Sequence, residues 1–352
     1  MPGSPFPVRL DQAIIDRQPG SSPPHPLSLS SSTSDWLDVS STTTQSVAQL
    51  RSTNYNATLT ERIDITPDLF RIRIRPDGEL PRFEPGQYVV LGLGYWEPRV
   101  QPSQRESVPE KKLTKLIRRA YSISCPMFDG EGGLLTCQAA DFWEFYVALV
   151  RGDDADSAPP PALTPRLFGL TVGDRLFVGS KITGTYTLAG VAPTDTVCLI
   201  ATGTGEAPHN AMVTELLSRG HTGKILNVTT VRHRRDAGYR AEQQRLMDRY
   251  ENYRYLLLTT REPENLDPKH PDFVGRQYVQ DLFTSGRLAE LVGDPLSPDN
   301  THAYLCGNPA MIGFVPPGGQ PLTRPGMLTL LQHAGFTAEE PGCGHVRFEK
   351  YW

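Results

Sequence analysis

The feature that most constrains the fold is the regular alternation of apolar runs and helix-like segments after Pro193. The runs TVCLIATGTG, KILNVTTVR and YRYLLLTTRE are each followed by a helical pattern, and a further run, HAYLCGNPAMI, comes after the last of these. Each run has the length of a buried strand, and the segments between runs can hold crossover helices. This alternation predicts a parallel sheet with helices packed against it.

The part of the chain from about residue 55 to residue 190 has a different pattern. NATLTERIDIT, LFRIRIRP, GQYVVLGLG, RAYSIS, LLTCQAA, FWEFYVALVRG, TVGDRLFVGS and TGTYTL have strand character and are separated by Pro, Gly and Asp. In LFRIRIRP the apolar side chains are expected to face in, toward the core, and Arg71, Arg73 and Arg75 are expected to face out. Short, closely spaced strands predict an antiparallel barrel or sandwich.

The first 53 residues are rich in Ser, Thr and Pro, and such a segment cannot bury enough apolar surface to offset its ordering entropy. We therefore expect a flexible tail over residues 1–53. It precedes an antiparallel β-barrel domain over residues 54–190 and an α/β parallel-sheet domain over residues 191–352, which ends in an aromatic tail.

Composition argues against several classes of protein. A formal net charge of −4 gives no support for nucleic-acid binding, and no segment approaches the roughly 18 apolar residues of a membrane-spanning helix. The five cysteines lack the spacing of zinc or iron–sulfur ligands, so no metal site is predicted. The start lacks the basic and apolar segments of a signal peptide. We expect a reduced, cytoplasmic protein with no membrane or nucleic-acid partner.

The segment Arg119-Ala120-Tyr121-Ser122 carries a cation, an aromatic ring and a hydroxyl on one predicted strand. On a strand, Arg119 and Tyr121 lie on one side, and Ser122 lies on the other side or at the edge. Such a strand suits a flavin, which presents a phosphate, a flat ring system and a reactive ring nitrogen. The alternative is structural, a surface salt bridge beside a half-buried tyrosine.

Two loops follow predicted strands of the second domain, which is where open α/β sheets bind ligands. The glycines of ATGTG (201–205) allow a diphosphate to approach the backbone, and the helix that follows favours negative charge at its N-terminus. A tight structural turn is the alternative. Cys306 and Gly307 suit the pocket of a flat ring such as nicotinamide, although a buried cysteine can also be a simple core residue.

Arginines end the next two apolar runs. Arg232 and Arg261 occupy these positions, and Arg276 stands at the start of the following helical pattern. Three arginines at one edge of a sheet can hold a dianion through forked hydrogen bonds. The 2′-phosphate of an adenosine fits this pattern, whereas an unmodified ribose would require an acidic residue. A local ion pair between Arg261 and Glu262 competes with this interpretation, and we favour the phosphate.

Three further segments have two possible interpretations each. In LTPRLFGL, Thr164 is expected to cap a short helix that would offer backbone N–H groups to a phosphate. The basic run over residues 111–119 is a solvated face or a docking patch for an acidic partner. The terminal Tyr351 and Trp352 form a core-docked tail or a lid that stacks on a flavin.

Together, and in this order, these motifs resemble the ferredoxin–NADP reductase family, in its bacterial ferredoxin (flavodoxin) reductase branch. The resemblance covers roughly residues 55–352. The matching segments are RAYS (119–122), EFYVALV (144–150), LTPRL (163–167), ATGTG (201–205), VRHRRDAGY (231–239), TTRE (259–262), GRQ (275–277), CGNPAMI (306–312) and EKYW (349–352).

The resemblance implies FAD in the first domain. Arg119 would pair with the FAD diphosphate, Tyr121 would pack on the flavin, and Ser122 would lie near its reactive nitrogen. The other residues that it implies for FAD are Ala120, Tyr146, the backbone at Leu163 and Thr164, and Tyr351 and Trp352, one stacked on the isoalloxazine and one on the adenine.

It also implies NADP(H) in the second domain. Its diphosphate would meet Gly203, Thr204 and Gly205, and its 2′-phosphate would meet Arg232, Arg261 and Arg276. Cys306 and Gly307 would border the nicotinamide, and the residues implied to be catalytic are Tyr121, Ser122 and Cys306.

The activity that this resemblance implies is that of a monomeric, FAD-dependent ferredoxin (or flavodoxin)–NADP reductase. Hydride would pass between NADP(H) and FAD, and single electrons would pass between FAD and an acidic ferredoxin or flavodoxin. Two alternatives are the reductase component of an oxygenase system and a flavin-binding regulatory subunit without turnover. The identity of the partner, the direction of flow and the role of the tail are left open.

Some segments depart from the family pattern. The loops at about residues 96–118 and 151–162 are longer than usual, and a proline-containing segment over residues 313–326 interrupts an expected helix. His209 stands where a bulky apolar or aromatic residue is common. The loop at 96–118 and the segment at 313–326 would affect partner docking rather than the chemistry.

Overall fold

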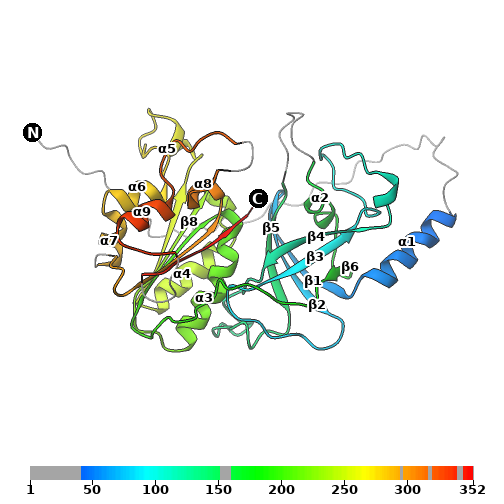
Figure 1. Cartoon of the computed structure of the whole chain (residues 1–352), viewed down its shortest axis with the longest axis horizontal. Helices are drawn as coiled ribbons and strands as arrows, with labels where there is room; N and C mark the ends of the chain where they lie inside the picture. Colours follow the sequence, from blue (N-terminus) through cyan, green and yellow to red (C-terminus); the bar gives the residue numbers. More distant parts are fainter. Residues whose placement is uncertain (1–40, 151–159, 294–295, 316–318, 339–343, 352) are drawn as a thin grey trace, which may run out of the picture. The chain divides into compact units, whose positions relative to one another are not determined.

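The computed structural model describes residues 41–150, 160–293, 296–315, 319–338 and 344–351 (Figure 1). Contacts divide the chain into two units, Met1–Ala48 and Gln49–Trp352. Helix α1 spans Ser41–Asn54, so the last part of the expected flexible tail is helical. The earlier part of that expected tail, residues 1–40, lies outside the described residues.

The end of α1 is held by a buried carboxylate. Arg51 forms an ion pair of 2.5 Å with Glu97, and the hydroxyl of Tyr55 donates a hydrogen bond of 2.8 Å to the same side chain. Glu97 is only 7% exposed, and a carboxylate buried this deeply requires such partners. Composition alone does not reveal this contact, because Glu97 is distant in the sequence.

The first domain is a six-stranded antiparallel sheet with the strand order β4-β3-β6-β1-β2-β5. The two outer strands are linked by a single bridge between Ser124, just beyond β4, and Glu144 of β5. The sheet is therefore curved like a barrel but is not closed by a full ladder. Its strands are β1 (Ala57–Thr66), β2 (Leu69–Pro76), β3 (Tyr88–Gly94), β4 (Leu116–Ser122), β5 (Trp143–Ala148) and β6 (Arg175–Val178).

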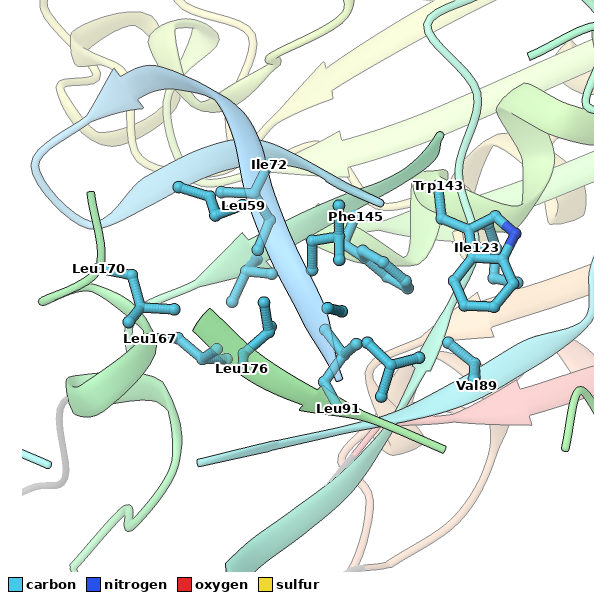
Figure 2. Close-up of a cluster of buried hydrophobic side chains, with 14 of the residues drawn as sticks. Leu59, Ile72, Val89, Leu91, Ile123, Trp143, Phe145, Leu167, Leu170 and Leu176 are labelled. Carbon is cyan, nitrogen blue, oxygen red and sulfur yellow. The ribbon is translucent and has the colours of Figure 1, made fainter. Parts of the chain in front are cut away.

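The concave side of this sheet holds an apolar core, to which helix α2 (Thr164–Leu167) contributes (Figure 2). As expected, the alternating apolar side chains of β2 are buried. Arg71 faces away from this core, as the alternation predicts, but it is only 9% exposed. It lies against the second domain, where it forms an ion pair with Glu242.

Two predicted strands of this domain are wrong. In LLTCQAA, Leu134 makes an isolated bridge with Phe128, and Cys137 is buried in the core without joining the sheet. In TGTYTL, Thr183 makes one bridge with Tyr88, and the rest of the segment has no ladder. A buried segment that does not pair with a neighbouring strand can have the same pattern of apolar residues as a paired strand, so the sequence did not distinguish the two. The predicted cap Thr164 is also wrong, since the N-cap position of α2 is Leu163.

The second domain is built on a five-stranded parallel sheet of order β11-β10-β7-β8-β9. Its strands are β7 (Thr196–Thr202), β8 (Ile225–Val231), β9 (Tyr253–Thr259), β10 (Thr301–Gly307) and β11 (Val346–Lys350). The chain runs from β7 outward to β9 and then returns to the other side of β7 with β10. The carboxyl ends of β7 and β10 therefore form the topological switch point, which is the expected ligand position.

Helices accompany these strands, as the alternating pattern predicts. The longest after β7 is α3 (Glu206–Ser218), and its residues before Ser218 are all buried. The others are α4 (Arg240–Arg249), α5 (Pro263–Leu266), α6 (Val279–Thr284), α7 (Arg287–Val292), α8 (Pro309–Ile312) and α9 (Met327–His333), with the 3₁₀ turns η1 (Glu110–Lys112), η2 (Gly203–Gly205) and η3 (Arg234–Asp236).

None of the helices in the described ranges combines the length and the apolar character that crossing a bilayer requires. Those ranges also contain no cluster of three or more His, Cys, Asp or Glu side chains placed to hold a metal ion.

Candidate active site

The loops after β7 and β10 meet at the switch point. The backbone N–H of Asn308 donates a hydrogen bond of 2.7 Å to the hydroxyl of Thr202. A Cβ atom on Gly205 would lie 2.4 Å from the carbonyl oxygen of Cys306, and one on Gly307 would lie 2.4 Å from the Thr202 hydroxyl. Glycine is therefore required at both positions for the two strand ends to approach this closely.

The turn η2 lies between β7 and α3 and presents an open backbone. Gly203 has a φ of +53°, and no atom lies within 4 Å of the position that its Cβ would occupy. Gly203 and Thr204 are partly exposed, whereas Gly205 is buried against β10. A turn with accessible N–H groups at the start of a 13-residue helix has the features of an anion site.

The three arginines predicted to bind a phosphate lie near the carboxyl ends of β8 and β9. Arg232 and Arg261 are adjacent, because the backbone N–H of Arg261 donates a hydrogen bond of 2.9 Å to the carbonyl of Arg232. Arg276 precedes α6 rather than starting it, and Gln277 beside it bonds the carbonyl of Thr259 at the end of β9. All three arginine side chains are exposed.

The competing ion pair between Arg261 and Glu262 does not form. Glu262 instead occupies the N-cap of α5 and accepts a hydrogen bond of 2.5 Å from the backbone N–H of Arg234. Among the described residues, no carboxylate forms an ion pair with Arg232, Arg261 or Arg276. Their guanidinium groups thus remain available to an external anion.

A cluster of polar side chains joins the two sheets at the end of β4. The hydroxyl of Ser122 donates a hydrogen bond of 3.0 Å to Glu349 of β11, and the hydroxyl of Tyr351 donates one of 2.7 Å to Ser122. Tyr351 also packs against the buried cluster that contains Cys306. Ser122, Cys306 and Tyr351, which were singled out from separate motifs, are thereby brought together.

Burial changes the acidity of this cluster. It raises the pKa of Glu349 to about 7, although the hydrogen bond from Ser122 opposes the shift. It also raises the pKa of the Cys306 thiol far above its usual value, so Cys306 is a neutral thiol and not a thiolate nucleophile. Glu349 is the one member of the cluster that can exchange a proton near neutral pH.

The sequence-based interpretation missed Glu349, although it lies in the EKYW segment that was singled out. Aromatic residues drew attention to that segment, whereas a lone glutamate near a terminus resembles an ordinary exposed charge. The parallel pairing of Cys306 with Glu349 places this carboxylate at the switch point. No local pattern carries that information.

The other residues singled out on β4 are accessible. Arg119 and Ala120 are exposed, and Tyr121 is partly exposed. The guanidinium of Arg119 donates a hydrogen bond of 2.8 Å to the carbonyl of Arg118, and no carboxylate of the described residues forms an ion pair with it. The surface salt bridge considered from the sequence is therefore absent from this part of the chain.

Tyr146 lies between the domains. It is buried, its hydroxyl donates a hydrogen bond of 2.8 Å to the carbonyl of Asp236, and it accepts one of 2.9 Å from Gly238. Leu163 is buried, and the hydroxyl of Thr164 accepts a bond of 3.3 Å from Val150. The expected role of Trp352 falls outside the described residues.

Comparisons with known proteins agree with this geometry. Residues 199–316 match the family model described as an oxidoreductase NAD-binding domain. A ferredoxin–NADP reductase of Pseudomonas aeruginosa is 29% identical to this chain over 240 residues, which make up 66% of the chain and 76% of that protein. Over 66% of its length the chain is similar to ferredoxin–NADP reductases. It is accordingly an oxidoreductase.

Two further similar proteins extend the comparison. A flavodoxin/ferredoxin–NADP reductase of Escherichia coli is 29% identical over 170 residues, which cover 48% of this chain and 62% of that protein. A ferredoxin–NADP reductase structure from Neisseria gonorrhoeae with bound FAD and NADP has a TM-score of 0.60 at 17% identity and covers 84% of this chain and 98% of its own. At that identity the likeness establishes the two-domain fold.

Proposed function

We propose that this reductase passes hydride between NADP(H) and a bound FAD, and single electrons between FAD and a ferredoxin or flavodoxin. The observation that carries the proposal is the meeting of the β4 end with the switch point of the parallel sheet, through Ser122, Glu349, Tyr351 and Cys306. A flavin seated on β4 and a nicotinamide at the switch point would approach each other there. Positioning supplies most of the catalysis for such a transfer.

The residues present suit FAD in the first domain. An exposed guanidinium without a carboxylate partner, Arg119, lies on the same strand as Tyr121 and Ser122, and it would hold the diphosphate. The backbone at Leu163 and Thr164, together with Ala120, Tyr146, Tyr351 and Trp352, would complete the cofactor's surroundings. When bound, FAD supplies the conversion between two-electron hydride chemistry and one-electron transfer.

The residues present also suit NADP(H) in the second domain. The diphosphate would lie against the open turn of Gly203, Thr204 and Gly205, because this turn leaves backbone N–H groups accessible. The exposed Arg232, Arg261 and Arg276 would hold the 2′-phosphate. Cys306 and Gly307 would border the nicotinamide.

Tyr121, Ser122 and Cys306 were expected to be the catalytic residues, and the geometry adds Glu349. We assign Tyr121 to packing on the flavin and Cys306 to shaping the nicotinamide pocket as a neutral thiol. The hydroxyl of Ser122 connects the edge of β4 to the carboxyl group of Glu349 at 3.0 Å. Glu349 would hold or release a proton at its Oε2 atom through this hydroxyl.

A basic surface leads to the same place. Lys111, Lys112, Lys115 and Arg118 are exposed ahead of Arg119. Such a surface attracts an acidic electron carrier and would guide it to the edge of β4. We further propose a cytoplasmic monomer, and the four free cysteines of the described residues fit a reducing compartment.

The test begins with the purified full-length protein. It should carry about one FAD per chain, and NADPH should bleach the flavin absorbance much faster than NADH does. Reduced ferredoxin or flavodoxin should appear under anaerobic turnover. A protein that binds no flavin after reconstitution, or a flavin that NADPH does not reduce, would refute the proposal. Rapid flavin reduction without transfer to either carrier would favour a role as the reductase of an oxygenase.

A further inference from the structure

A buried ion pair connects the two domains. Arg71 of β2 lies 2.7 Å from the carboxylate of Glu242 in the first turn of α4. The side chains are 11% and 20% exposed, so both charges are largely removed from water. The guanidinium of Arg71 also lies 4.4 Å from the ring centroid of Tyr239, directly before α4. Arg71 of the first domain thus contacts the start of α4 in the second domain.

The residues around this pair form a continuous polar network. The hydroxyl of Tyr239 donates a hydrogen bond of 2.8 Å to the fully buried Glu144 of β5 and lies 3.0 Å from the hydroxyl of Ser124. Asn210 of α3 donates to that Ser124 hydroxyl at 3.4 Å. The network therefore reaches from the first domain into the helix that follows the nucleotide-binding turn.

The far end of the network lies directly beside that turn. Gln243 of α4 donates one hydrogen bond of 3.0 Å to Asn210 and one of 2.8 Å to Glu206, the residue after Gly205. The near end, Ser124, lies two residues beyond Ser122. Tyr239 also packs edge-on against Tyr146, with ring centroids 5.0 Å apart, and Tyr146 pairs with Arg71 in the sheet. Both proposed cofactor sites are thus connected to the same interdomain contact.

A buried ion pair is a costly way to hold two surfaces together, because both charges lose their hydration and the Nε of Arg71 finds no hydrogen-bond partner among the described atoms. Apolar side chains would hold the same surfaces but would allow them to slide. A guanidinium that must meet both a carboxylate and a ring face permits one arrangement. The ion pair therefore fixes the orientation of the two domains relative to each other.

We propose that the Arg71–Glu242 pair, closed over Tyr239, is a positioning contact that sets the orientation of the nicotinamide nucleotide site relative to the flavin site. This inference rests on the proposed function. Arg71 acts through the placement of α4 and α3 and touches neither cofactor. Displacements on the order of 1 Å can slow a transfer that depends on near-attack geometry by up to about a hundredfold.

The experiment compares Arg71→Met with Arg62→Met. Arg62 is a matched control because it pairs with Asp64 at 2.9 Å and stacks on Phe70 at 4.9 Å, entirely within the first domain. Three quantities are measured: the FAD content, the dissociation constant of adenosine 2′,5′-bisphosphate, and the limiting rate of flavin bleaching by NADPH in stopped flow. The probe occupies only the second domain, so its affinity does not depend on domain orientation.

We expect Arg71→Met to keep its FAD and to bind the probe within about twofold of the wild type, while the limiting bleaching rate falls about tenfold or more. Arg71→Lys should recover part of that rate. Glu242→Gln should reproduce the loss, and the double variant should be no slower than Arg71→Met. Arg62→Met should lower the thermal midpoint without changing the bleaching rate.

A wild-type bleaching rate in Arg71→Met would overturn the positioning role, and so would a loss equal to that of Arg62→Met. If Arg71→Met fails to fold, Glu242→Gln decides the question, since a wild-type rate in that more exposed variant overturns the role equally. Absence of NADPH-driven bleaching in the wild-type protein would instead refute the proposed function.

Discussion

At the scale of single residues, we expect Glu349 to accept the proton that leaves the site. Transfer of electrons from NADPH to a one-electron acceptor releases one proton, and Glu349 can accept it only when ionised. Its pKa is raised to about 7 by burial, so NADPH-dependent reduction of ferricyanide should rise with pH through about 7. Glu349→Gln should lower kcat about tenfold and remove that rise. A matched change of an exposed carboxylate, Glu131→Gln, should leave the pH profile unchanged.

We expect Arg261 to set the preference between the two nicotinamide cofactors. An exposed guanidinium without a carboxylate partner can bond a phosphate that NADH lacks, and a charge-assisted bond of this kind is worth on the order of 1.5–3 kcal/mol. Arg261→Ala should therefore raise the KM for NADPH about tenfold or more and leave the KM for NADH unchanged. Arg287→Ala, which removes an arginine paired with Glu290 on α7, should change neither constant. An equal effect of Arg261→Ala on both cofactors would remove the phosphate assignment.

At the scale of elements, helix α3 buries two titratable groups whose effects on stability oppose each other. Burial lowers the pKa of His209 from 6.5 to about 3. The contribution of the neutral His209 side chain to the unfolding free energy is therefore complete above pH 6.5 and is lost as the pH falls. Burial raises the pKa of Glu206 from 4.5 to about 7. The contribution of the protonated Glu206 side chain to the unfolding free energy is therefore complete below pH 4.5 and is lost as the pH rises.

Two substitutions in α3 should consequently shift stability in opposite directions. As the pH falls from 6.5 to 5, the unfolding free energy of His209→Phe should increase by about 2 kcal/mol relative to that of the wild type. As the pH rises from 5 to 7, the unfolding free energy of Glu206→Gln should increase by a similar amount relative to that of the wild type. Urea unfolding at each pH measures both differences. Parallel pH profiles for either variant and the wild type would show that the corresponding group does not titrate differently on folding.

The elements also show what a sequence can predict. Parallel strands buried on both faces read as continuous apolar runs, so β7, β8, β9 and β10 were recognised and their carboxyl ends identified the loops of the site. LLTCQAA was mistaken for a strand because burial of Cys137 imitates strand pairing. The contact that buries Arg71 involves a residue of α4, and no local pattern reveals a partner so distant in the chain.

At the scale of the whole molecule, the net charge of −4 conceals a basic surface over residues 111–119. Lys115 is exposed directly before β4, the strand that would seat the flavin, and an acidic electron carrier would approach along this strand. Electrostatic guidance of this kind acts mainly on the association rate and weakens as salt shortens the screening length from about 10 Å at 0.1 M.

Charge reversal on this surface should therefore affect one acceptor and spare another. Lys115→Glu should raise the KM for ferredoxin or flavodoxin several-fold at low salt, with the difference shrinking above about 0.3 M salt, while ferricyanide reduction stays at the wild-type rate. Arg254→Glu is the matched control. Arg254 is also exposed, but it lies at the amino-terminal end of β9, whereas the proposed nucleotide site lies at the carboxyl ends of the parallel strands. If the two reversals had the same effect on the protein acceptor, net charge alone would explain the association, and the basic surface would not be its docking site.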